Sequence, residues 1–316
     1  MPDRPALHIV IVNWNGGARL AECLRSIASA RRETVVLRRV TVVDNGSTDG
    51  SAQNLDGCGI PLHVVRNPRN VGFAAACNQG SRGCAADYLL LLNPDTRLSA
   101  TALEAPVAFL EAAENAGVGI CGVQLVDDAG RVSRTCARFP TPGRFVARGL
   151  ALDRVAPRAF PPHFMVEWPH GESRAVDQVM GAFFLTRGAL WARLGGFDER
   201  FFVYFEEVDY ALRARAAGYG SYFLTATQVY HEGGASSGQV PARRLFYSLR
   251  SRILYSCKHF GAPGAALVLL STLALEPWTR LALQGARGSL RGAGETLAAY
   301  GLLWRNLPRI LAAARR

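Results

Sequence analysis

Short apolar runs alternate with stretches of helical spacing through the first part of the chain. The runs HIVIVN (8–13), VTVVDN (40–45), LHVVRN (62–67) and YLLLLN (88–93) have the length and composition of buried β-strands. Each stretch between them carries apolar residues at helical intervals. The alternation predicts βαβ units and a parallel sheet, which is an α/β fold.

The middle of the chain has a less regular pattern. A strand and turn are expected in VGICGVQLVDDAG (118–130), and a strand in VDQVMGAFFLTR (176–187). The segment between them is rich in proline and indicates a substrate loop or an inserted flap. After a Gly-Gly turn, the second half of 197–219 returns to helical spacing.

From about residue 241 the pattern is helical and strongly basic. A basic amphipathic segment (243–259), the apolar run AALVLLSTLAL (265–275) and a further helix at about 297–312 follow one another. We therefore predict a catalytic domain over 1–240 and a basic helical region over 241–316. Of the formal net charge of +11, the residues from 240 onward carry +10, with twelve basic side chains against two acidic ones.

This basic region favours an anionic membrane surface as a partner, because Leu, Ala, Trp and Tyr are interleaved with the arginines. The 11-residue apolar run is shorter than the roughly 20 residues that span a bilayer. Attachment at the membrane interface is therefore the prediction, with a packed core helix or a true span as alternatives. Nucleic acid is not expected as a partner, since no recognition motif accompanies the charge.

The cysteines and the N-terminus predict a cytoplasmic protein. The first residues show no charged region followed by a long apolar stretch and a cleavage site. The seven cysteines are scattered and form no paired C-x-x-C pattern, so reduced thiols are expected. They are Cys23, Cys58, Cys77, Cys84, Cys121, Cys136 and Cys257.

Polar residues end each of the four predicted strands and are expected to meet at one edge of the sheet. The chain lacks both G-x-x-x-x-G-K-[ST] and a G-x-G-x-x-G that opens a helix after the first strand. A diphosphate bound there would need neutralisation by another device, such as Mg²⁺ or Mn²⁺ held by carboxylates. Asp95 in LLLLNPD and Asp44 in DNGSTDG are candidates, although both sequences are also ordinary turn formers.

A second acidic group consists of Glu206, Glu207 and Asp209, which follow several aromatic residues. Carboxylates among aromatic side chains have raised pKa values, and such a group suits a general base for a hydroxyl. The alternative is simple stabilisation of the helix dipole by an acidic first turn. His231 in VYHEGG is either a structural histidine or part of a metal site.

Seven segments, taken in order, resemble the family 2 glycosyltransferases of the GT-A fold, and especially their bacterial rhamnosyltransferase-like branch. The segments are IVNWNG (11–16), VVDNGSTDGS (42–51), NVGFAAACNQG (70–80), LLLNPD (90–95), VDQVMGAFFLTRGAL (176–190), GGFDERFFVYFEEVDYALRARAAGY (195–219) and VYHEGG (229–234). The resemblance covers most of residues 8–235. It implies a Rossmann-like, mixed and mainly parallel sheet flanked by helices, to which the C-terminal helices are an appendage.

The resemblance also implies roles for individual residues. The implied donor-binding residues are Asn13, Trp14, Asn15, Asp44, Asn45, Ser47, Arg66, Asn70, Gly72, Phe73, Asn78, Asn93 and Asp95. Asp95 and His231 would hold the divalent cation, Mg²⁺ or Mn²⁺. Asp177, Gly181 and Ala182 would contact the acceptor, with the segment 134–180 contributing to its recognition.

Two positions depart from the commoner pattern of the family. Glu207 matches the general base, although Asp is more usual after Glu206; Glu206 and Asp209 are alternatives for the same task. Asn93 stands where many relatives have the first Asp of D-x-D, so one possible metal ligand is absent.

Together, these implications predict an inverting, metal-assisted glycosyltransferase at the inner face of the cytoplasmic membrane. The donor implied is dTDP-rhamnose or a UDP-sugar, and the acceptor a hydroxyl of a cell-envelope or lipid-linked glycan. The alternative is a catalytically silent protein on the same fold that binds nucleotide sugars or a membrane surface.

Overall fold

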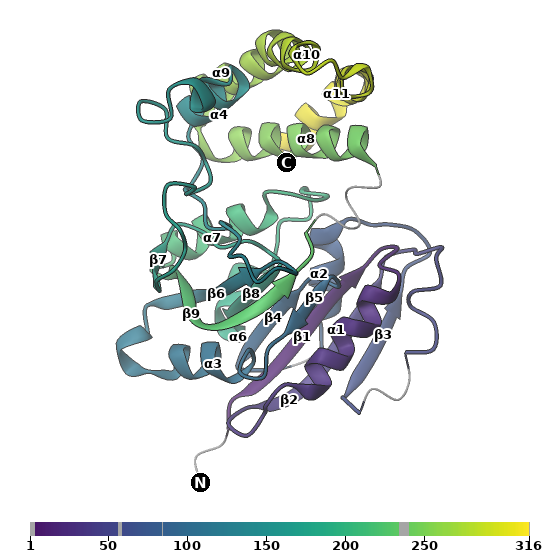
Figure 1. Cartoon of the computed structure of the whole chain (residues 1–316), viewed down its shortest axis with the longest axis vertical. Helices are drawn as coiled ribbons and strands as arrows, with labels where there is room; N and C mark the ends of the chain where they lie inside the picture. Colours follow the sequence, from purple (N-terminus) through teal and green to yellow (C-terminus); the bar gives the residue numbers. More distant parts are fainter. Residues whose placement is uncertain (1–3, 56–58, 84, 234–239, 316) are drawn as a thin grey trace. The chain divides into compact units, whose positions relative to one another are not determined.

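A computed structural model describes the whole chain except residues 1–3, 56–58, 84, 234–239 and 316 (Figure 1). Cys58, Cys84 and Gly234 therefore lie outside the described residues. The chain divides into two compact units. The first comprises Met1–Arg138, Phe164–Glu199 and Glu206–Ser236, and the second comprises Phe139–His163, Arg200–Phe205 and Ser237–Arg316. The second unit takes in 139–163 and 200–205 as well as the C-terminal region. A domain boundary near residue 240 stays a prediction.

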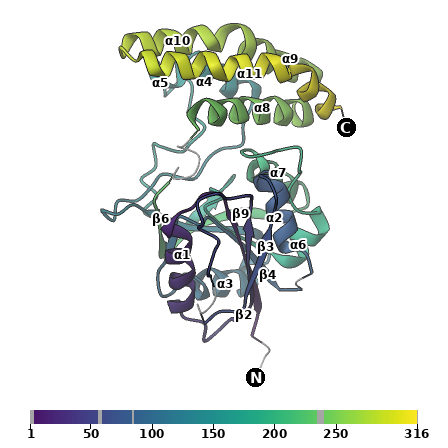
Figure 2. The same cartoon turned by 90° about the vertical axis from the view of Figure 1, so that its right-hand side faces the viewer.

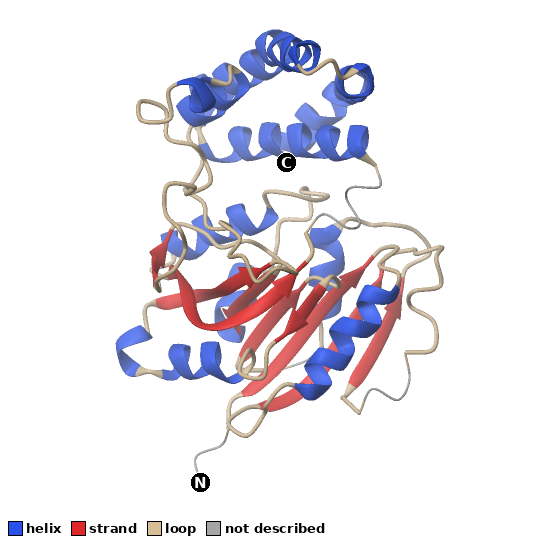
Figure 3. Ribbon diagram, in the orientation of Figure 1, coloured by secondary structure: helices blue, strands red, loops and turns tan. Residues whose placement is uncertain are grey.

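The first unit is built on one mixed sheet (Figure 3). Its strands are β1 (Ala6–Asn13), β2 (Val36–Asp44), β3 (Leu62–Arg66), β4 (Tyr88–Leu92), β5 (Thr96–Leu98), β6 (Val118–Val126), β7 (Arg174–Val176), β8 (Phe183–Arg187) and β9 (Gly220–His231). The order is β3-β2-β1-β4-β8-β6-β9-β5, and β7 pairs with β9. Among the described strands, β5, β7 and β8 run against the direction of the others. The prediction of an α/β fold with a mixed, mainly parallel sheet is thus confirmed.

Helices cover both faces of this sheet (Figure 2). They are α1 (Ala18–Ser29), α2 (Phe73–Ser81), α3 (Glu104–Glu111), the short 3₁₀ helix η1 (Ala113–Asn115), α6 (Gly188–Leu194) and α7 (Glu206–Ala216). Leu7, Ile9 and Ile11 of β1 join α1 and α3 in one hydrophobic cluster. On the other face, a Cβ at Gly80 of α2 would lie 2.6 Å from Val10 Cγ1, so only glycine allows this close approach. Because both faces are covered, every residue of β1 is buried.

The second unit is helical. Its helices are α4 (Pro142–Gly149), α5 (Leu152–Val155), α8 (Pro241–His259), α9 (Gly261–Leu270), the π-helical turn η3 (Ser271–Leu275), α10 (Glu276–Ala286) and α11 (Leu290–Ala314). Apolar side chains of α8 and α11, such as Ile253 and Leu303, are fully buried. Buried Glu276 pairs with Arg252 and Arg280, which compensates each charge for its removal from water.

The apolar run predicted at 265–275 is part of a longer helix. Within the described residues, Gly261–Ala286 is the one helix long and apolar enough to cross a membrane by length and composition. Of its most apolar stretch of 18 residues, 22% is buried. Its exposed apolar side chains include Leu270 (64% exposed) and Trp278 (71%). Glu276 within this helix is only 2% exposed. The helix therefore has an exposed apolar side, whereas its buried side carries Glu276 together with Ser271, Thr272 and Val268.

Candidate active site

The carboxyl ends of β1 and β2 carry a network of polar side chains. Asn13 and Asp44 are register partners at the ends of these parallel strands. The Asn13 side-chain amide donates to Asp44 Oδ1 (3.4 Å), Ser47 Oγ (3.1 Å) and Ser51 Oγ (2.8 Å). Because Asn13 is fully buried, its amide fixes the loop after β2 and, with that loop, the carboxylate of Asp44.

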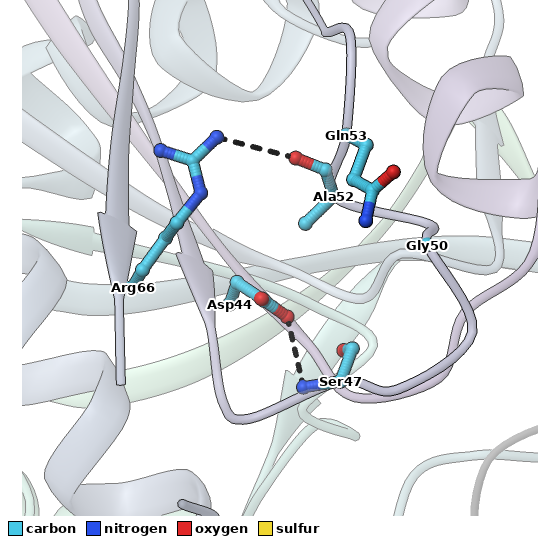
Figure 4. A pocket seen from close by; sticks show the side chains of 6 residues that line it. All are labelled: Asp44, Ser47, Gly50, Ala52, Gln53 and Arg66. Carbon is cyan, nitrogen blue, oxygen red and sulfur yellow. Dashed lines mark hydrogen bonds between the residues drawn. The ribbon is translucent and has the colours of Figure 1, made fainter. Parts of the chain in front are cut away.

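Asp44 and Arg66 line a cavity of about 160 Å³ beside this network (Figure 4). They are register partners on β2 and β3. The other lining residues are Ser47, Gly50, Ala52 and Gln53. Asp44 Oδ1 accepts from the backbone N–H of Ser47 (3.3 Å), and Arg66 Nη2 donates to the carbonyl of Ala52 (3.4 Å). A carboxylate and a guanidinium in one cavity offer acceptors and donors to a heterocyclic base and to ribose hydroxyls.

The turn after β1 is joined to the same loop. Asn15 has a positive φ of 51°, a conformation that asparagine tolerates better than most residues. Its backbone N–H donates to Ser47 Oγ (2.9 Å), and its side-chain oxygen accepts from Thr48 N–H (2.8 Å). Trp14, which precedes it, is half-buried. The structure therefore brings together the predicted donor residues of the first two strands.

The predicted donor residues before and in α2 are engaged in holding the backbone. The side-chain amide of buried Asn45 donates to Asn70 Oδ1 (3.0 Å) and to the carbonyl of Gly72 (3.1 Å). Gly72 has a φ of 96° and precedes Phe73, the first residue of α2. These contacts tie the loop before α2 to the end of β2. Whether the side chains also contact a donor stays a prediction.

Asn78 makes a similar link on the other side of α2. Its amide donates to the carbonyl of Phe197 (2.8 Å) and to Glu199 Oε1 (3.0 Å), while its oxygen accepts from the Phe197 N–H (2.9 Å). All hydrogen-bonding groups of this side chain are thus directed at the segment 197–199. This geometry indicates a bracing role for Asn78.

Asp95 lies in the turn between β4 and β5 and contacts His231 at the end of β9. The antiparallel register of β5 and β9 pairs Thr96 with His231. As a result, Asp95 Oδ1 lies 3.4 Å from His231 Nε2, and Asn93 Nδ2 lies 3.5 Å from the same nitrogen. Asp95 is 9% exposed. The two predicted metal ligands, 136 positions apart in the sequence, are therefore neighbours.

The charge state of Asp95 suits a cation. Burial raises the pKa of its carboxyl, but the hydrogen bond and charge of His231 and the charge of Arg19 outweigh burial and lower the pKa below its ordinary value. The described part of the chain contains no cluster of three His, Cys, Asp or Glu side chains suited to a metal. Asp95 and His231 alone would leave most positions around a divalent cation to water and to a bound diphosphate, and their role as metal ligands stays a prediction.

Sequence patterns did not reveal a second charged pair beside Asp95. Arg19, in the first turn of α1, forms a two-point ion pair with Glu232, whose backbone N–H donates to the carbonyl of Asp95 (3.2 Å). Both side chains are 39% exposed, so water screens the pair. The acidic residue directly after the histidine of VYHEGG was the only signal in the sequence. Arg19 is a cationic group close to the predicted diphosphate position.

The acidic residues of α7 follow a left-handed turn. Tyr204 and Phe205 have φ values of 68° and 71°, where bulky residues are rare and each costs on the order of 1–3 kcal/mol. The three acidic side chains that follow differ in environment. Asp209 is fully buried and its Oδ2 accepts from Arg213 Nε (2.8 Å), whereas Glu206 is 4% exposed. The ion pair with Arg213 indicates a structural role for the Asp209 carboxylate.

Glu207 differs from these two residues because it is half-buried. Its buried Oε2 accepts no hydrogen bond from any described residue. Burial raises the pKa of its carboxyl, although backbone hydrogen bonds to Glu207 and Val208 partly offset this effect. A carboxylate with a raised pKa and an uncommitted oxygen can accept a proton from a hydroxyl.

The predicted acceptor residues lie around β7 and β8. Asp177 is half-buried and lies 3.6 Å from Arg215 in an ion pair. Ala182 is only 1% exposed, and its carbonyl accepts from the Asn93 N–H (3.0 Å). Ala182 therefore supports the turn that carries Asp95, and Gly181, just before it, is half-buried. An acceptor role for these three residues stays a prediction.

Comparison with known sequences relates the first part of the chain to a known family. The sequence profile described as "Glycosyl transferase family 2" matches residues 8–159. The chain carries a family 2 glycosyltransferase domain. The matched part of this glycosyltransferase domain includes Asn13, Asp44 and Asp95, whereas Glu207 and His231 follow it.

Two curated relatives of this glycosyltransferase support the rhamnosyltransferase-like branch. The N-acetylglucosaminyl-diphospho-decaprenol L-rhamnosyltransferase of Mycobacterium tuberculosis is 27% identical over 264 residues, 79% of this chain and 83% of that protein. Rhamnosyltransferase WbbL of Escherichia coli is 24% identical over 173 residues, 54% of this chain and 61% of WbbL. The prediction of a glycosyltransferase is confirmed.

Solved structures similar to this glycosyltransferase show its fold. The mannosyltransferase PcManGT from Pyrobaculum calidifontis, in complex with GDP-Man and Mn²⁺, has a TM-score of 0.55 at 19% identity, covering 99% of this chain and 87% of that one. S. aureus TarS 1–349 in complex with UDP-GlcNAc has a TM-score of 0.55 at 15% identity, covering 98% and 87%. The prediction of a GT-A fold is confirmed.

Proposed function

We propose that this glycosyltransferase moves rhamnose from dTDP-rhamnose to a hydroxyl of a lipid-linked, N-acetylglucosamine-containing glycan, with inversion at the anomeric carbon. The observation that carries the proposal is the contact of Asp95 with His231 in the same unit as the Asp44–Arg66 cavity. The name of the Mycobacterium tuberculosis relative supports the choice of sugar and acceptor.

The donor is proposed to bind at the carboxyl ends of the strands. Asp44 and Arg66 hold the base and ribose, and Arg19 adds a positive charge near the diphosphate. Asp95 and His231 hold a divalent cation, Mg²⁺ or Mn²⁺, as the Mn²⁺ in the PcManGT structure suggests. When bound, the cation stabilises the charge that develops on the departing diphosphate.

Glu207 is proposed to act on the acceptor. Its carboxylate accepts the proton of the acceptor hydroxyl while the hydroxyl oxygen forms a bond to the anomeric carbon. The bond from that carbon to the diphosphate breaks on the opposite side, so one displacement inverts the configuration. The raised pKa makes the ionised Glu207 a stronger base than an exposed glutamate.

The helical unit is proposed to lie on the anionic inner face of the cytoplasmic membrane, where a lipid-linked acceptor is accessible. Exposed Leu267, Leu270 and Trp278 form part of an apolar surface on Gly261–Ala286. The arginines from residue 287 onward supply the charge for anionic headgroups.

Donor binding can be tested by thermal unfolding in a panel of nucleotide sugars. We expect dTDP-rhamnose at about 100 times its Kd, with Mn²⁺, to add about 2.7 kcal/mol of stability, and EDTA to remove most of this gain. A larger shift with a UDP-sugar would reassign the donor. No shift with any nucleotide sugar, with or without metal, would contradict the proposal and favour another ligand.

Membrane attachment can be tested by sedimentation with vesicles. We expect the full chain to sediment with vesicles containing anionic phosphatidylglycerol and to be released by high salt, because Debye screening weakens attraction to the headgroups. Leu270→Ser combined with Trp278→Ala should abolish sedimentation. Val155→Ser serves as control and should have no effect, because Val155 is an apolar residue that is 81% exposed but lies in α5, outside Gly261–Ala286. Equal sedimentation of all variants would argue against this surface.

A further inference from the structure

Residues 200–205, which lead directly into α7 and Glu207, lie along α8 within the second unit. Ser251 Oγ donates to the carbonyl of Val203 (2.9 Å), and Arg250 Nη1 donates to the carbonyl of Arg200 (2.9 Å). Ser251 is fully buried. A helix remote in sequence therefore supplies hydrogen-bond donors to two carbonyls of this segment.

Aromatic contacts join the same two segments. Phe202 stacks on Tyr247, with 4.6 Å between ring centroids and 19° between planes. Phe205 lies 5.5 Å from the ring of Tyr255. Because residues three and four apart share one side of a helix, Tyr247, Ser251 and Tyr255 belong to one stripe of α8. This stripe of α8 is occupied by the segment 200–205.

The conformation of the segment needs such support. Tyr204 and Phe205 are both left-handed, and neither residue favours that region. A strained conformation persists only where surrounding contacts hold it in place. The bond from Ser251 reaches the carbonyl directly before this pair, and Glu206 begins α7 directly after it.

We propose that Ser251 and Arg250 are positioning residues for Glu207: by fixing the carbonyls of Val203 and Arg200, they maintain the left-handed turn from which the chain enters the first turn of α7. The inference rests on the proposed role of Glu207 as the base. It gives α8, which belongs to the basic helical region, a role in holding the six residues that precede Glu206 in the chain.

The experiment measures release of dTDP from dTDP-rhamnose by the full chain, with N-acetylglucosaminyl-diphospho-polyprenol as acceptor, across a range of pH. Ser251→Ala is expected to lower kcat about 10-fold to 100-fold, because a small displacement of a catalytic group has effects of this size. The KM for dTDP-rhamnose should not change. The acid limb of kcat should move to lower pH, because a displaced Glu207 is more hydrated and its pKa falls.

Matched variants separate positioning from loss of the fold. Ser251→Cys keeps a weak donor and should give an intermediate kcat. Ser256→Ala on the same helix removes a hydroxyl that donates to the Arg252 carbonyl, within α8 itself, and should leave kcat unchanged. Asparagine tolerates the left-handed conformation, so adding Tyr204→Asn to Ser251→Ala should restore part of the lost kcat. If Ser251→Ala does not fold, Arg250→Met, which removes the donor to the Arg200 carbonyl, is compared with Arg250→Lys, which keeps a donor.

Two results would overturn the inference. An unchanged kcat and acid limb in Ser251→Ala would show that the turn needs no support from α8. Parallel loss of kcat and of dTDP affinity would indicate general damage to the protein. If Glu207→Gln keeps full turnover, the proposed base is wrong, whereas an inactive Glu207→Gln with an unaffected Ser251→Ala refutes only the positioning role.

Discussion

Glu207→Gln is expected to reduce turnover by a factor of about 10²–10⁴, which is the usual contribution of a positioned general base. Glutamine has nearly the same shape but cannot accept the proton of the acceptor hydroxyl. Donor affinity should survive, because the Asp44–Arg66 cavity lies at the ends of β2 and β3. Initial rates and calorimetric binding of dTDP-rhamnose measure the two quantities separately.

The same variant is expected to raise the thermal stability of the protein. Burial raises the pKa of Glu207, so the folded state holds its proton more tightly than the unfolded chain does. Ionised Glu207 therefore costs stability as pH rises through the raised pKa, and neutral glutamine has no such cost. The Tm of Glu207→Gln should exceed that of the wild type at pH 8, and the difference should shrink near pH 4.

Glu104→Gln provides the matched control. Glu104 also lies in the first turn of a helix, α3, and its Oε1 accepts from the Thr34 N–H (2.8 Å), a bond that the glutamine oxygen can keep. This control should leave turnover and donor affinity unchanged. Substantial turnover in Glu207→Gln, together with an unchanged acid limb in its pH profile, would remove Glu207 from the role of base.

The first four strands of the sheet followed from the sequence because buried parallel strands are continuous apolar runs. The run 88–93 corresponds to β4 (Tyr88–Leu92), and the run 62–67 to β3 (Leu62–Arg66). What the pattern did not indicate was the position of β8, which lies antiparallel between β4 and β6. An apolar run predicts a strand, but pairing and direction depend on contacts between distant segments.

Some residues of the site were predicted from the sequence and others were not, again because contacts between distant segments bring them together. Asp95 and His231 were matched by family motifs, and their contact depends on the register of β5 and β9. The pair of Arg19 with Glu232 was not predicted, because the acidic residue after His231 does not reveal its partner and exposed charges are common on any surface. The left-handed turn before Glu207 was also missed, since Tyr204 and Phe205 are residue types that rarely adopt that conformation.

Asp95→Asn is expected to reduce kcat/KM by a factor of about 10²–10³, because loss of charge stabilisation at the diphosphate is worth several kcal/mol. Asparagine keeps one oxygen but no negative charge, so half-maximal activation should require at least about 10-fold more Mn²⁺, equivalent to 1.36 kcal/mol. Binding of thymidine, which has no diphosphate, should not change. Steady-state rates over a Mn²⁺ titration and calorimetry with thymidine measure these quantities.

The effect of this variant on stability should be opposite to that of Glu207→Gln. The pKa of Asp95 is lowered, so its ionised form stabilises the folded state above the pKa of the unfolded chain, and this stability is lost as pH falls through the lowered pKa. Asp95→Asn should therefore lower the Tm at pH 7. Asp128→Asn, which alters an exposed carboxylate paired with Arg97, is the control and should retain the wild-type Mn²⁺ requirement. If Asp95→Asn also retains it, the cation is held by other groups, and the role of Asp95 reduces to its contact with His231.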